Sequence, residues 1–460
     1  MLHPFSIFRS TSLGRLRCIS TNLCSRLFSS SSRSPWLTLP PTFEGDDMIH
    51  NFYSLADNKV LSFNKGYIPK GPQYLRGGSH LELPENDSVI IGSSHGYLAL
   101  LNQHRGDVFL YNPISGWLRK LPCLANLVDN YDLKLRTLKF ILSFSPDNHD
   151  PLEYFRAIVS FGPGDRLAFC LPGVSYEWTP IGISGDKPIY GAYAYSYRYQ
   201  DFVYSTMDKL FYAINDLSVH SWDLSERRAP RVEPTRWLRP WCDFSTIRSR
   251  DHHLMSIGID ETKDTYPWPY RSEEDNKLKD LCRQLKYLIS LSDGRLFLVI
   301  RHVVEQMAPD GSPYVEPEDD IHLECYSDSD YEYDKVKVDY PYKTVGFDVH
   351  HIVRDEAKWR LTYMEGSLDG MTMFVGSSQS FALSSSEFPE LKANAIYFAD
   401  DKDLSEFHPP GYRTSSSYGG HDVGIFDYEN RIISSCYYPC DYNSIRKIEP
   451  TPMWFTPTEE

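Results

Sequence analysis

The segment Gly92-Ser93-Ser94-His95-Gly96 matches a catalytic pattern, the Gly-x-Ser-x-Gly of a nucleophile elbow, with Ser94 in the central position. That chemistry requires a strand that turns sharply into a helix, so that the serine hydroxyl stands above the sheet. Here Ile90 and Ile91 precede the motif, and Tyr97-Leu-Ala-Leu follows it. This order predicts a strand, a turn and a strand. We therefore interpret the motif as a hairpin turn in which glycines supply positive φ.

Several other groups have metal-ligating side chains, but their spacing argues against a metal site. Residues 328–334 alternate carboxylates as a calcium loop does, yet they lack its central Gly and the Glu at its twelfth position. The pairs His252-His253 and His350-His351 are adjacent, and neighbours on a strand point to opposite faces. Cys436 and Cys440 are four residues apart with no His pair nearby. We interpret Asp400-Asp401 as a turn that caps a strand, rather than as a catalytic or metal dyad.

Signals for phosphate and nucleic-acid binding are also missing from the sequence. It contains no P-loop and no Gly-x-Gly-x-x-Gly cradle. Its aromatic residues are not interleaved with basic ones, as binding of single-stranded nucleic acid requires. The net charge of −15 disfavours phosphate backbones and anionic lipid surfaces. We therefore predict no catalytic, cofactor-binding or metal-ligating residue, no cofactor, no enzymatic activity and no nucleic-acid partner.

Nine cysteines and the hydropathy pattern add two expectations. The number of Cys is odd and no Cys-x-x-Cys pair occurs, which favours reduced thiols over a disulfide framework or a zinc site. No run of about eighteen apolar residues is present, so we do not expect an integral membrane protein.

The composition favours an all-β fold. Aromatic residues make up 14% of the chain, with 32 Tyr and 24 Phe, and 31 Pro and 27 Gly are scattered along it. Residues 372–401 hold three short apolar runs separated by turn residues, which is typical of β-strands. About one strand per ten residues leaves no room for crossover helices, so antiparallel pairing is expected. Short helices are predicted only over 276–285 and 132–141.

A weak internal repeat predicts a ring of such strands. A strand, a tight turn and a Trp recur at Trp117, Trp178 and Trp359, and more loosely at Trp222. This is the layout expected of paired strands in a propeller blade. Residues 35–460 number 426, and propeller repeats use about 40–50 residues each. We predict a single kelch-like β-propeller of about six or seven blades, with a jelly roll or a pair of sandwiches as the alternative.

The first 34 residues have the composition of a targeting segment. They contain five Arg and no Asp, Glu or Lys, whereas the remainder carries 42 basic and 62 acidic residues. Arg26-Leu27-Phe28-Ser29 is similar to a plant mitochondrial processing pattern, which predicts cleavage after Phe28. We predict mitochondrial localisation through the import machinery, with a chloroplast or the cytosol as alternatives. The propeller domain is then predicted over 35–457, with irregular loop insertions at 232–272 and 316–334.

Ordered short motifs along the chain resemble one plant family. They include Gly92-Ser-Ser-His-Gly-Tyr-Leu98, Tyr111-Asn-Pro113, Leu291-Ser-Asp-Gly-Arg-Leu296, Phe374-Val-Gly376, Asn394-Ala-Ile-Tyr-Phe-Ala-Asp-Asp401 and Pro452-Met-Trp-Phe-Thr-Pro457. Together they are similar to the F-box-associated propellers, also called domain of unknown function 295. The resemblance implies a propeller that binds a protein.

The start of the chain departs from this family. Typical members carry an F-box, a helical hook for a ubiquitin-ligase scaffold, ahead of the propeller. Here Pro35-Trp-Leu-Thr-Leu-Pro40 follows the leader directly, so the chain resembles an organelle-targeted branch without an F-box. The leading hypothesis is a non-enzymatic, organellar, protein-binding propeller whose partner the sequence does not identify. Two alternatives stay open: an enzyme with its site in the propeller channel, and a cytosolic relative of the ligase adaptors.

Overall fold

The computed structural model describes most of the predicted propeller. The described residues are 34–44, 47–64, 88–102, 104–127, 139–147, 154–161, 166–181, 199–215, 218–224, 231–232, 236–237, 278, 281–314, 340–354, 359–401, 417–440 and 444–457. The predicted leader, the loop 316–334 and His252-His253 lie outside these residues, as does most of 232–272.

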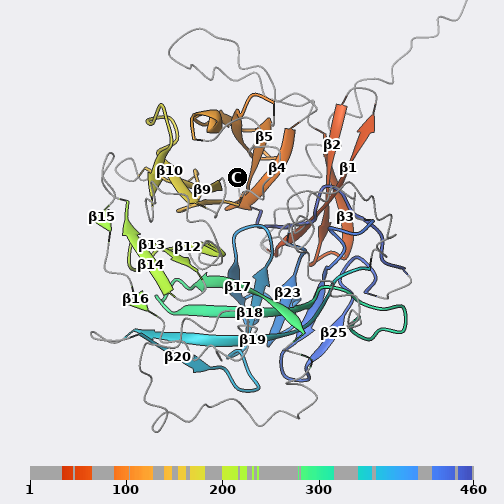
Figure 1. The fold of residues 1–460 in the computed structure, drawn as a ribbon. Coiled ribbons are helices and arrows are strands. Elements are labelled where there is room, and N and C mark those ends of the chain that lie inside the picture. Colours follow the sequence, from red (N-terminus) through yellow and green to blue (C-terminus); the bar gives the residue numbers. More distant parts are fainter. Residues whose placement is uncertain are drawn as a thin grey trace, which may run out of the picture.

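The described residues form six β-sheets that stand around a common centre, and the chain visits the sheets in order (Figure 1). This arrangement confirms the all-β prediction and the single propeller, with six blades. The first three blades have four strands each. Blade 1 is β26 (Trp454–Phe455), β1 (Trp36–Glu44), β2 (Asp47–Ser54) and β3 (Lys59–Asn64). Blade 2 is β4 (Ser88–Ser94), β5 (Tyr97–Asn102), β6 (Val108–Tyr111) and β7 (Leu118–Lys120), and blade 3 is β8 (Phe140–Leu142), β9 (Ala157–Phe161), β10 (Arg166–Cys170) and β11 (Thr179–Ile181).

The other three blades include two with five strands. Blade 4 is β12 (Asp201–Ser205), β13 (Leu210–Ile214) and β14 (Ser218–Asp223), with β15 (Arg231–Val232) and β16 (Arg236–Trp237) both paired to β14. Blade 5 is β17 (Cys282–Ser290), β18 (Leu296–Val304), β19 (Lys343–Arg354) and β20 (Trp359–Tyr363). Blade 6 runs in the order β22 (Phe381–Ser384), β21 (Met371–Val375), β23 (Ala395–Phe398), β24 (Gly424–Asp427) and β25 (Ile432–Ser434).

One strand of each blade lies at the centre of the ring. The contacts between neighbouring blades join β26 to β4, β4 to β8, β12 to β17 and β17 to β22. Each of these strands stands at one end of its sheet, so this end is the inner one. Polar side chains on the inner strands therefore face a shared central space.

Apolar side chains hold the blades together at every seam. Six buried clusters are present, and each one combines residues from two adjacent blades. In the seam between blades 1 and 2, for example, Trp36 and Phe455 pack with Leu98 and Phe109. Sequential blades thus share their cores, and the last seam is closed by β26, which pairs with β1.

Blade 6 departs from the expected antiparallel pairing at one place. β21 and β23 are parallel, with Thr372 opposite Ala395 and Val375 opposite Phe398. The reason is that β22 folds back on the inner edge of β21, which leaves β23 to pair with the outer edge after the chain has returned along 385–394. The blade therefore gains an additional inner strand.

Of the helix predicted over 276–285, Leu278 is helical, whereas the residues from Cys282 onward belong to a strand; the helix predicted over 132–141 is wrong at its described end. Residues 282–290 form β17 and residues 140–142 form β8. In β17 residues 285–289 are all buried, and successive apolar side chains face different blades: Tyr287 and Ile289 pack against blade 6, whereas Leu288 packs against blade 4, which is the alternation of a strand. Besides Leu278, the helical residues of the described part include a short 3-10 helix, Leu124–Asn126. Among them, no helix has the length and apolar character needed to cross a membrane.

Candidate functional site: the polar centre of the ring

Residues 376–380, Gly-Ser-Ser-Gln-Ser, connect β21 to β22 and contact the inner strands of three other blades; we name them the strap. The backbone N–H of Gln379 donates to the Ser93 carbonyl at 3.3 Å, and the Ser94 hydroxyl donates to the Gln379 side-chain oxygen. The Ser380 hydroxyl donates to Asp201 at 3.2 Å. Because Ser94 belongs to blade 2 and Asp201 to blade 4, the strap must cross the centre of the ring.

A buried ion pair lies beside the strap. Lys139 Nζ is 2.6 Å from Asp201 Oδ1 and 3.4 Å from the Gly376 carbonyl. Asp201 is fully buried and also accepts from the backbone N–H of Leu288, which belongs to blade 5. Burial raises the pKa of Asp201, although Lys139 opposes this effect. The pair thus links blades 3, 4, 5 and 6, and its charges are already compensated.

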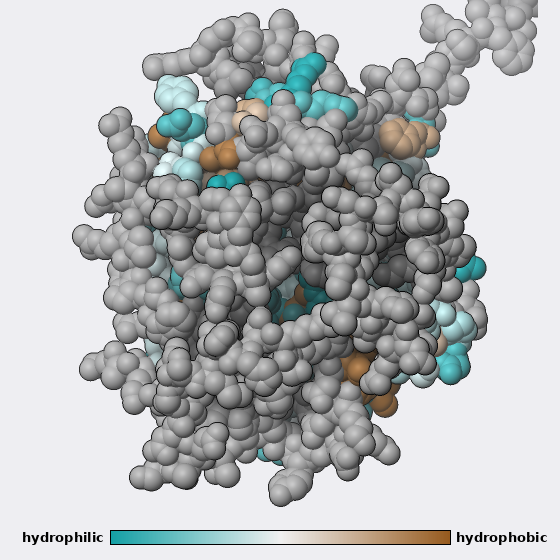
Figure 2. Space-filling view, viewed as in Figure 1, coloured by the Kyte–Doolittle hydropathy of each residue, from teal (hydrophilic) through white to brown (hydrophobic). Residues whose placement is uncertain are grey.

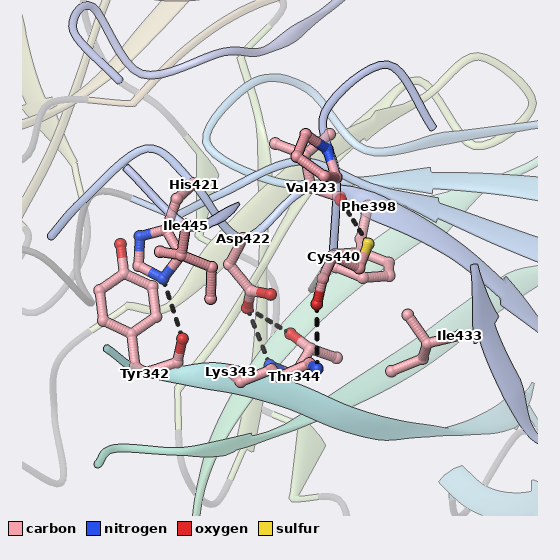
Figure 3. Close-up of a pocket in the computed structure, with 11 residues that line it drawn as sticks. Tyr342, Lys343, Thr344, Phe398, His421, Asp422, Val423, Ile433, Cys440 and Ile445 are labelled. Carbon is pink, nitrogen blue, oxygen red and sulfur yellow. Dashed lines mark hydrogen bonds between the residues drawn. The ribbon is translucent and has the colours of Figure 1, made fainter. Parts of the chain in front are cut away.

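A second buried network lies in the seam between blades 5 and 6, and Figure 3 shows two of its members, Thr344 and Asp422. Arg301 on β18 is fully buried and uses its whole guanidinium. It donates to Thr344 Oγ1 at 2.7 Å, to the Ala399 carbonyl at 2.7 Å and to Asp422 Oδ2 at 2.8 Å. Asp422 also accepts from the hydroxyl and the backbone N–H of Thr344. Every one of these donors is therefore committed to the fold.

Asp400 adds a second carboxylate to this network. It accepts from the Tyr342 hydroxyl at 2.6 Å and from the backbone N–H of Asp422 at 3.2 Å. Burial raises the pKa of Asp400 to about 6, and the neighbouring Asp422 acts in the same direction. His421 accepts from the Gly419 N–H through Nδ1, so its Nε2 carries the hydrogen that is donated to the Tyr342 carbonyl at 2.9 Å. Asp400 does follow a strand as predicted, but it is a buried member of a network rather than part of a turn.

The small pocket at this network has little space. The region open to the centre of a water molecule measures about 10 Å³, which suits about one water. Asp422, His421 and Cys440 contribute to its lining. One carboxylate and one histidine, Asp422 and His421, line the pocket, and its volume is too small for a substrate-sized molecule. Among the described residues, no group of three or more His, Cys, Asp or Glu is arranged to hold a metal ion.

Tyr287 on β17 connects the two networks. Lys139 Nζ lies 5.7 Å from the centre of its ring, within the range of a cation–π contact. Its hydroxyl accepts from Arg301 and donates to Asp401 at 3.1 Å. A continuous polar path therefore runs from the strap to the seam between blades 5 and 6.

The structure bears out the interpretation of Ser94 as part of a hairpin. β4 ends at Ser94, β5 begins at Tyr97, and the turn between them has positive φ at His95 (49°) and Gly96 (79°). The first positive φ thus belongs to His95 rather than to a glycine. The Ser94 hydroxyl also accepts from the Leu142 N–H, and no described His or carboxylate is hydrogen-bonded to it. Burial lowers the pKa of His95 to about 4.

The other candidate residues are not brought together. His350 contacts Tyr363 and His351 contacts Phe297, on opposite faces of β19 as expected. Cys436 and Cys440 are free thiols, and burial raises the pKa of both. Residues 328–334 and His252-His253 lie outside the described residues.

Lys139, Asp201 and Arg301 were missed by the analysis of the sequence. Each is a single charged residue at the end of a strand or within an apolar run, so spacing gives no signal. Arg301 follows Leu296-Phe-Leu-Val-Ile300 and precedes His302-Val-Val304, and a charge inside such a run is the one available sign of a buried ion pair. Asp201, directly before Phe202-Val-Tyr204, offers the same sign.

Six blades, a ring closed by the last strand and a polar centre define the protein class as a six-bladed β-propeller. A profile of the KIB1-4 beta-propeller family matches residues 69–427. The chain belongs to this family.

Comparisons beyond the family are weak. No curated protein matches the chain. The luciferin-regenerating enzyme structure is 9% identical, with 58% of this chain and 71% of that chain covered and a TM-score of 0.24. The Kluyveromyces lactis Hsv2 structure is 9% identical; the match covers 72% of this chain and 98% of that chain, with a TM-score of 0.22. The structure of Pseudomonas aeruginosa periplasmic gluconolactonase, PpgL, is 11% identical; the match covers 72% of this chain and 95% of that chain, with a TM-score of 0.22. At these TM-scores the likenesses carry no argument about function.

Proposed function

We propose that the chain is a non-enzymatic propeller that binds a partner protein. The propeller fold and the family support an interaction module. The observation that carries the proposal is the strap, because the chain's own residues occupy the centre where a propeller enzyme would hold its substrate. Asp201 is hydrogen-bonded to Ser380 and paired with Lys139, and Ser94 is bonded to Gln379. The polar groups best placed for chemistry are thus engaged with the fold.

The seam between blades 5 and 6 supports the same proposal. Its carboxylates are bonded to Arg301, Thr344 and Tyr342, and the adjoining pocket has room for about one water. A general acid or base must reach the substrate at hydrogen-bond distance. A buried carboxylate with this little free space beside it is better suited to stabilising the seam than to catalysis.

We propose further that the protein resides in mitochondria and is related to the F-box-associated domains. The support is the leader, with five Arg and no acid in 34 residues, and the ordered motifs of the propeller. A fluorescent fusion of residues 1–50 should enter mitochondria, and the matched variant Arg15→Glu with Arg17→Glu should not. A cytosolic or chloroplast signal from the unchanged fusion would contradict this localisation.

The protein-binding proposal is tested by proximity labelling in isolated mitochondria. The full chain carries the labelling enzyme, and the control carries residues 1–50 with the same enzyme, so that both reach the same compartment. We expect a reproducible set of proteins labelled by the full chain and not by the control. No difference between the two would contradict the proposal. Association of the chain with a ubiquitin-ligase scaffold in cytosolic extract would favour the adaptor alternative instead.

A further inference from the structure

The strap differs in composition from the two strands that hold it. On either side, Phe374 and Phe381 stack at a centroid distance of 4.8 Å within the apolar core shared with blade 1. The strap itself, Gly-Ser-Ser-Gln-Ser, has no apolar side chain. Burial of polar groups does not stabilise a fold unless each group finds a partner. The strap is therefore fixed at its base and contributes little apolar packing along its length.

The structure gives four hydrogen bonds from the strap to other blades: the one between the Ser94 hydroxyl and the Gln379 side-chain oxygen is close, and the other three are long. The distances are 3.3 Å from the Gln379 N–H to Ser93, 3.2 Å from Ser380 to Asp201 and 3.4 Å from Lys139 to Gly376. These values lie at or beyond the long end of the range for protein hydrogen bonds. The hydroxyls of Ser377 and Ser378 are buried without a hydrogen-bond partner in the described part of the chain. The strap is thus held less well than the strands around it.

Gly376 provides a hinge at the start of the strap. Its φ of +151° is a conformation that residues with a side chain rarely adopt, and an added Cβ would lie 3.2 Å from both Cβ and the carbonyl oxygen of Ala399. The chain therefore leaves β21 abruptly at this point. Because Phe374 and Phe381 are stacked at its two ends, any movement of the strap must take place between Gly376 and Ser380.

The strap is buried except at Gln379. Gln379 is half-buried, as is every residue of β22 from Phe381 to Ser384. Figure 2 shows a hollow in the middle of one face of the molecule, with hydrophilic and hydrophobic residues of the described part visible at its floor.

We propose that the strap is a displaceable internal occupant of the ring centre, whose place is taken by a polar extended segment of the partner protein. This inference rests on the proposed function and names the chemistry of the partner. The segment would present a carbonyl to Lys139, an N–H to the Ser93 carbonyl and a hydroxyl to Asp201, as the strap does. A segment of the Gly-Ser-Ser-Gln-Ser type meets these requirements, because the strap supplies the same groups from Gly376, Gln379 and Ser380.

The test measures binding of the strap sequence as a separate peptide. A fluorescent peptide with residues 375–381, Val-Gly-Ser-Ser-Gln-Ser-Phe, is titrated with the full chain, and fluorescence anisotropy gives the dissociation constant. The variant Gln379→Ala with Ser380→Ala removes two of the strap's own contacts. We expect this variant to bind the peptide at least about tenfold more tightly than the unchanged chain does, since its internal competitor is weakened. A peptide with Ala at the same two positions should bind neither protein.

A matched control variant lies on the same hairpin. Ser384 and Ser386 are hydrogen-bonded to each other at 2.7 Å on the exposed side, outside the ring centre. Ser384→Ala with Ser386→Ala should bind the peptide as the unchanged chain does. Should the strap variant fail to fold, as judged by its thermal transition, Ser380→Ala alone is used in its place.

Two results would overturn the inference. One is a folded strap variant that binds the peptide no better than the unchanged chain. The other is hydrogen exchange at the Gln379 amide as slow as at the amides of β21, because a strap that opens must exchange faster than the strand before it. Both measurements use the purified chain alone. If both measurements overturned the inference, the protein-binding proposal would still stand. A partner search that finds nothing would not change the result of either measurement.

Discussion

Arg301 shows how a single residue organises the seam between blades 5 and 6. Its guanidinium is fully buried and donates to Thr344, Ala399 and Asp422. Removal of one partner of a buried ion pair leaves the other charge without compensation, which costs about 3–5 kcal/mol. Arg301→Ala should therefore lower the free energy of unfolding by about this amount, measured by urea denaturation.

The shape of the guanidinium matters in addition to its charge. Arg301→Lys keeps the charge but cannot reach Thr344, Ala399 and Asp422 together, because an ammonium lacks the planar fork. The lysine variant should recover less than half of the stability lost in the alanine variant. Full recovery would show that charge alone holds the seam.

Asp400 predicts a dependence of stability on pH. Its folded pKa of about 6 lies above the ordinary value of 3.8, so the folded state holds the proton more tightly than the unfolded state does. The contribution of Asp400 to stability should therefore be greatest below about pH 4, fall as the pH rises to about 6, and then stay level. The full loss is at most about 3 kcal/mol for a shift of about two pH units.

Asp400→Asn tests this dependence directly. The asparagine oxygen can still accept from the Tyr342 hydroxyl and the Asp422 N–H, but it carries no charge. The variant should be about 1–3 kcal/mol more stable at pH 7, and its stability should vary less between pH 4 and 6, measured by urea denaturation. If the free energy of unfolding of the variant changed with pH as steeply as that of the unchanged chain, another group would have to titrate in this range.

At the scale of the element, two glycines are required for different reasons. Gly92 sits at a bulge of β4, where an added Cβ would lie 2.7 Å from the carbonyl oxygen of Phe140 on β8. Gly92→Ala should lower the melting temperature by overpacking the inner strands, at a cost of about 1–3 kcal/mol.

Gly311 has φ +83° and nothing within 4 Å of its added Cβ. Gly311→Ala should cost only the strain of the left-handed backbone, about 1–2 kcal/mol, and should leave the near-UV spectrum of the core unchanged.

The elements that the sequence predicted well are those with a local signal. Trp117, Trp178 and Trp359 mark the start of the fourth strand in blades 2, 3 and 5, so their repeat reflected a real position in the blade. Trp222 lies on the third strand of blade 4, which explains its looser fit. The parallel pair in blade 6 could not be predicted, because it depends on which edge of β21 a later segment meets.

The polar centre of the ring could not be predicted from the sequence either. Three of its residues come from distant parts of the sequence: Lys139 precedes β8, Asp201 begins β12 and Ser380 lies in the strap. No periodicity of the sequence relates these positions. Their meeting follows from the closure of the ring. Sequence reasoning identified the blades and the hairpin at Ser94, whereas the site arises from the arrangement of the blades.

At the scale of the whole molecule, stability depends on β26, which joins the end of the chain to its beginning. Leu37 pairs with Trp454 and Trp36 with Phe455, and the Met453 N–H donates to the Thr38 hydroxyl at 2.8 Å. Trp454 and Phe455 are buried almost completely, in two different seams. Loss of a buried Trp or Phe side chain costs about 3–5 kcal/mol, so loss of both approaches the whole stability of a typical protein, about 5–15 kcal/mol.

Deletion of residues 451–460 should therefore abolish cooperative thermal unfolding. It also exposes the inner edge of β1, and an unpaired edge promotes association with other chains. Size-exclusion chromatography should show the truncated chain shifting to larger species, while a control that ends after Pro457 should behave as the full chain does. Trp454→Ala alone should retain the fold and lower the free energy of unfolding by about 3–5 kcal/mol. A truncated chain with an unchanged melting temperature and elution volume would mean that the seams of blades 2 to 6 hold the ring without closure.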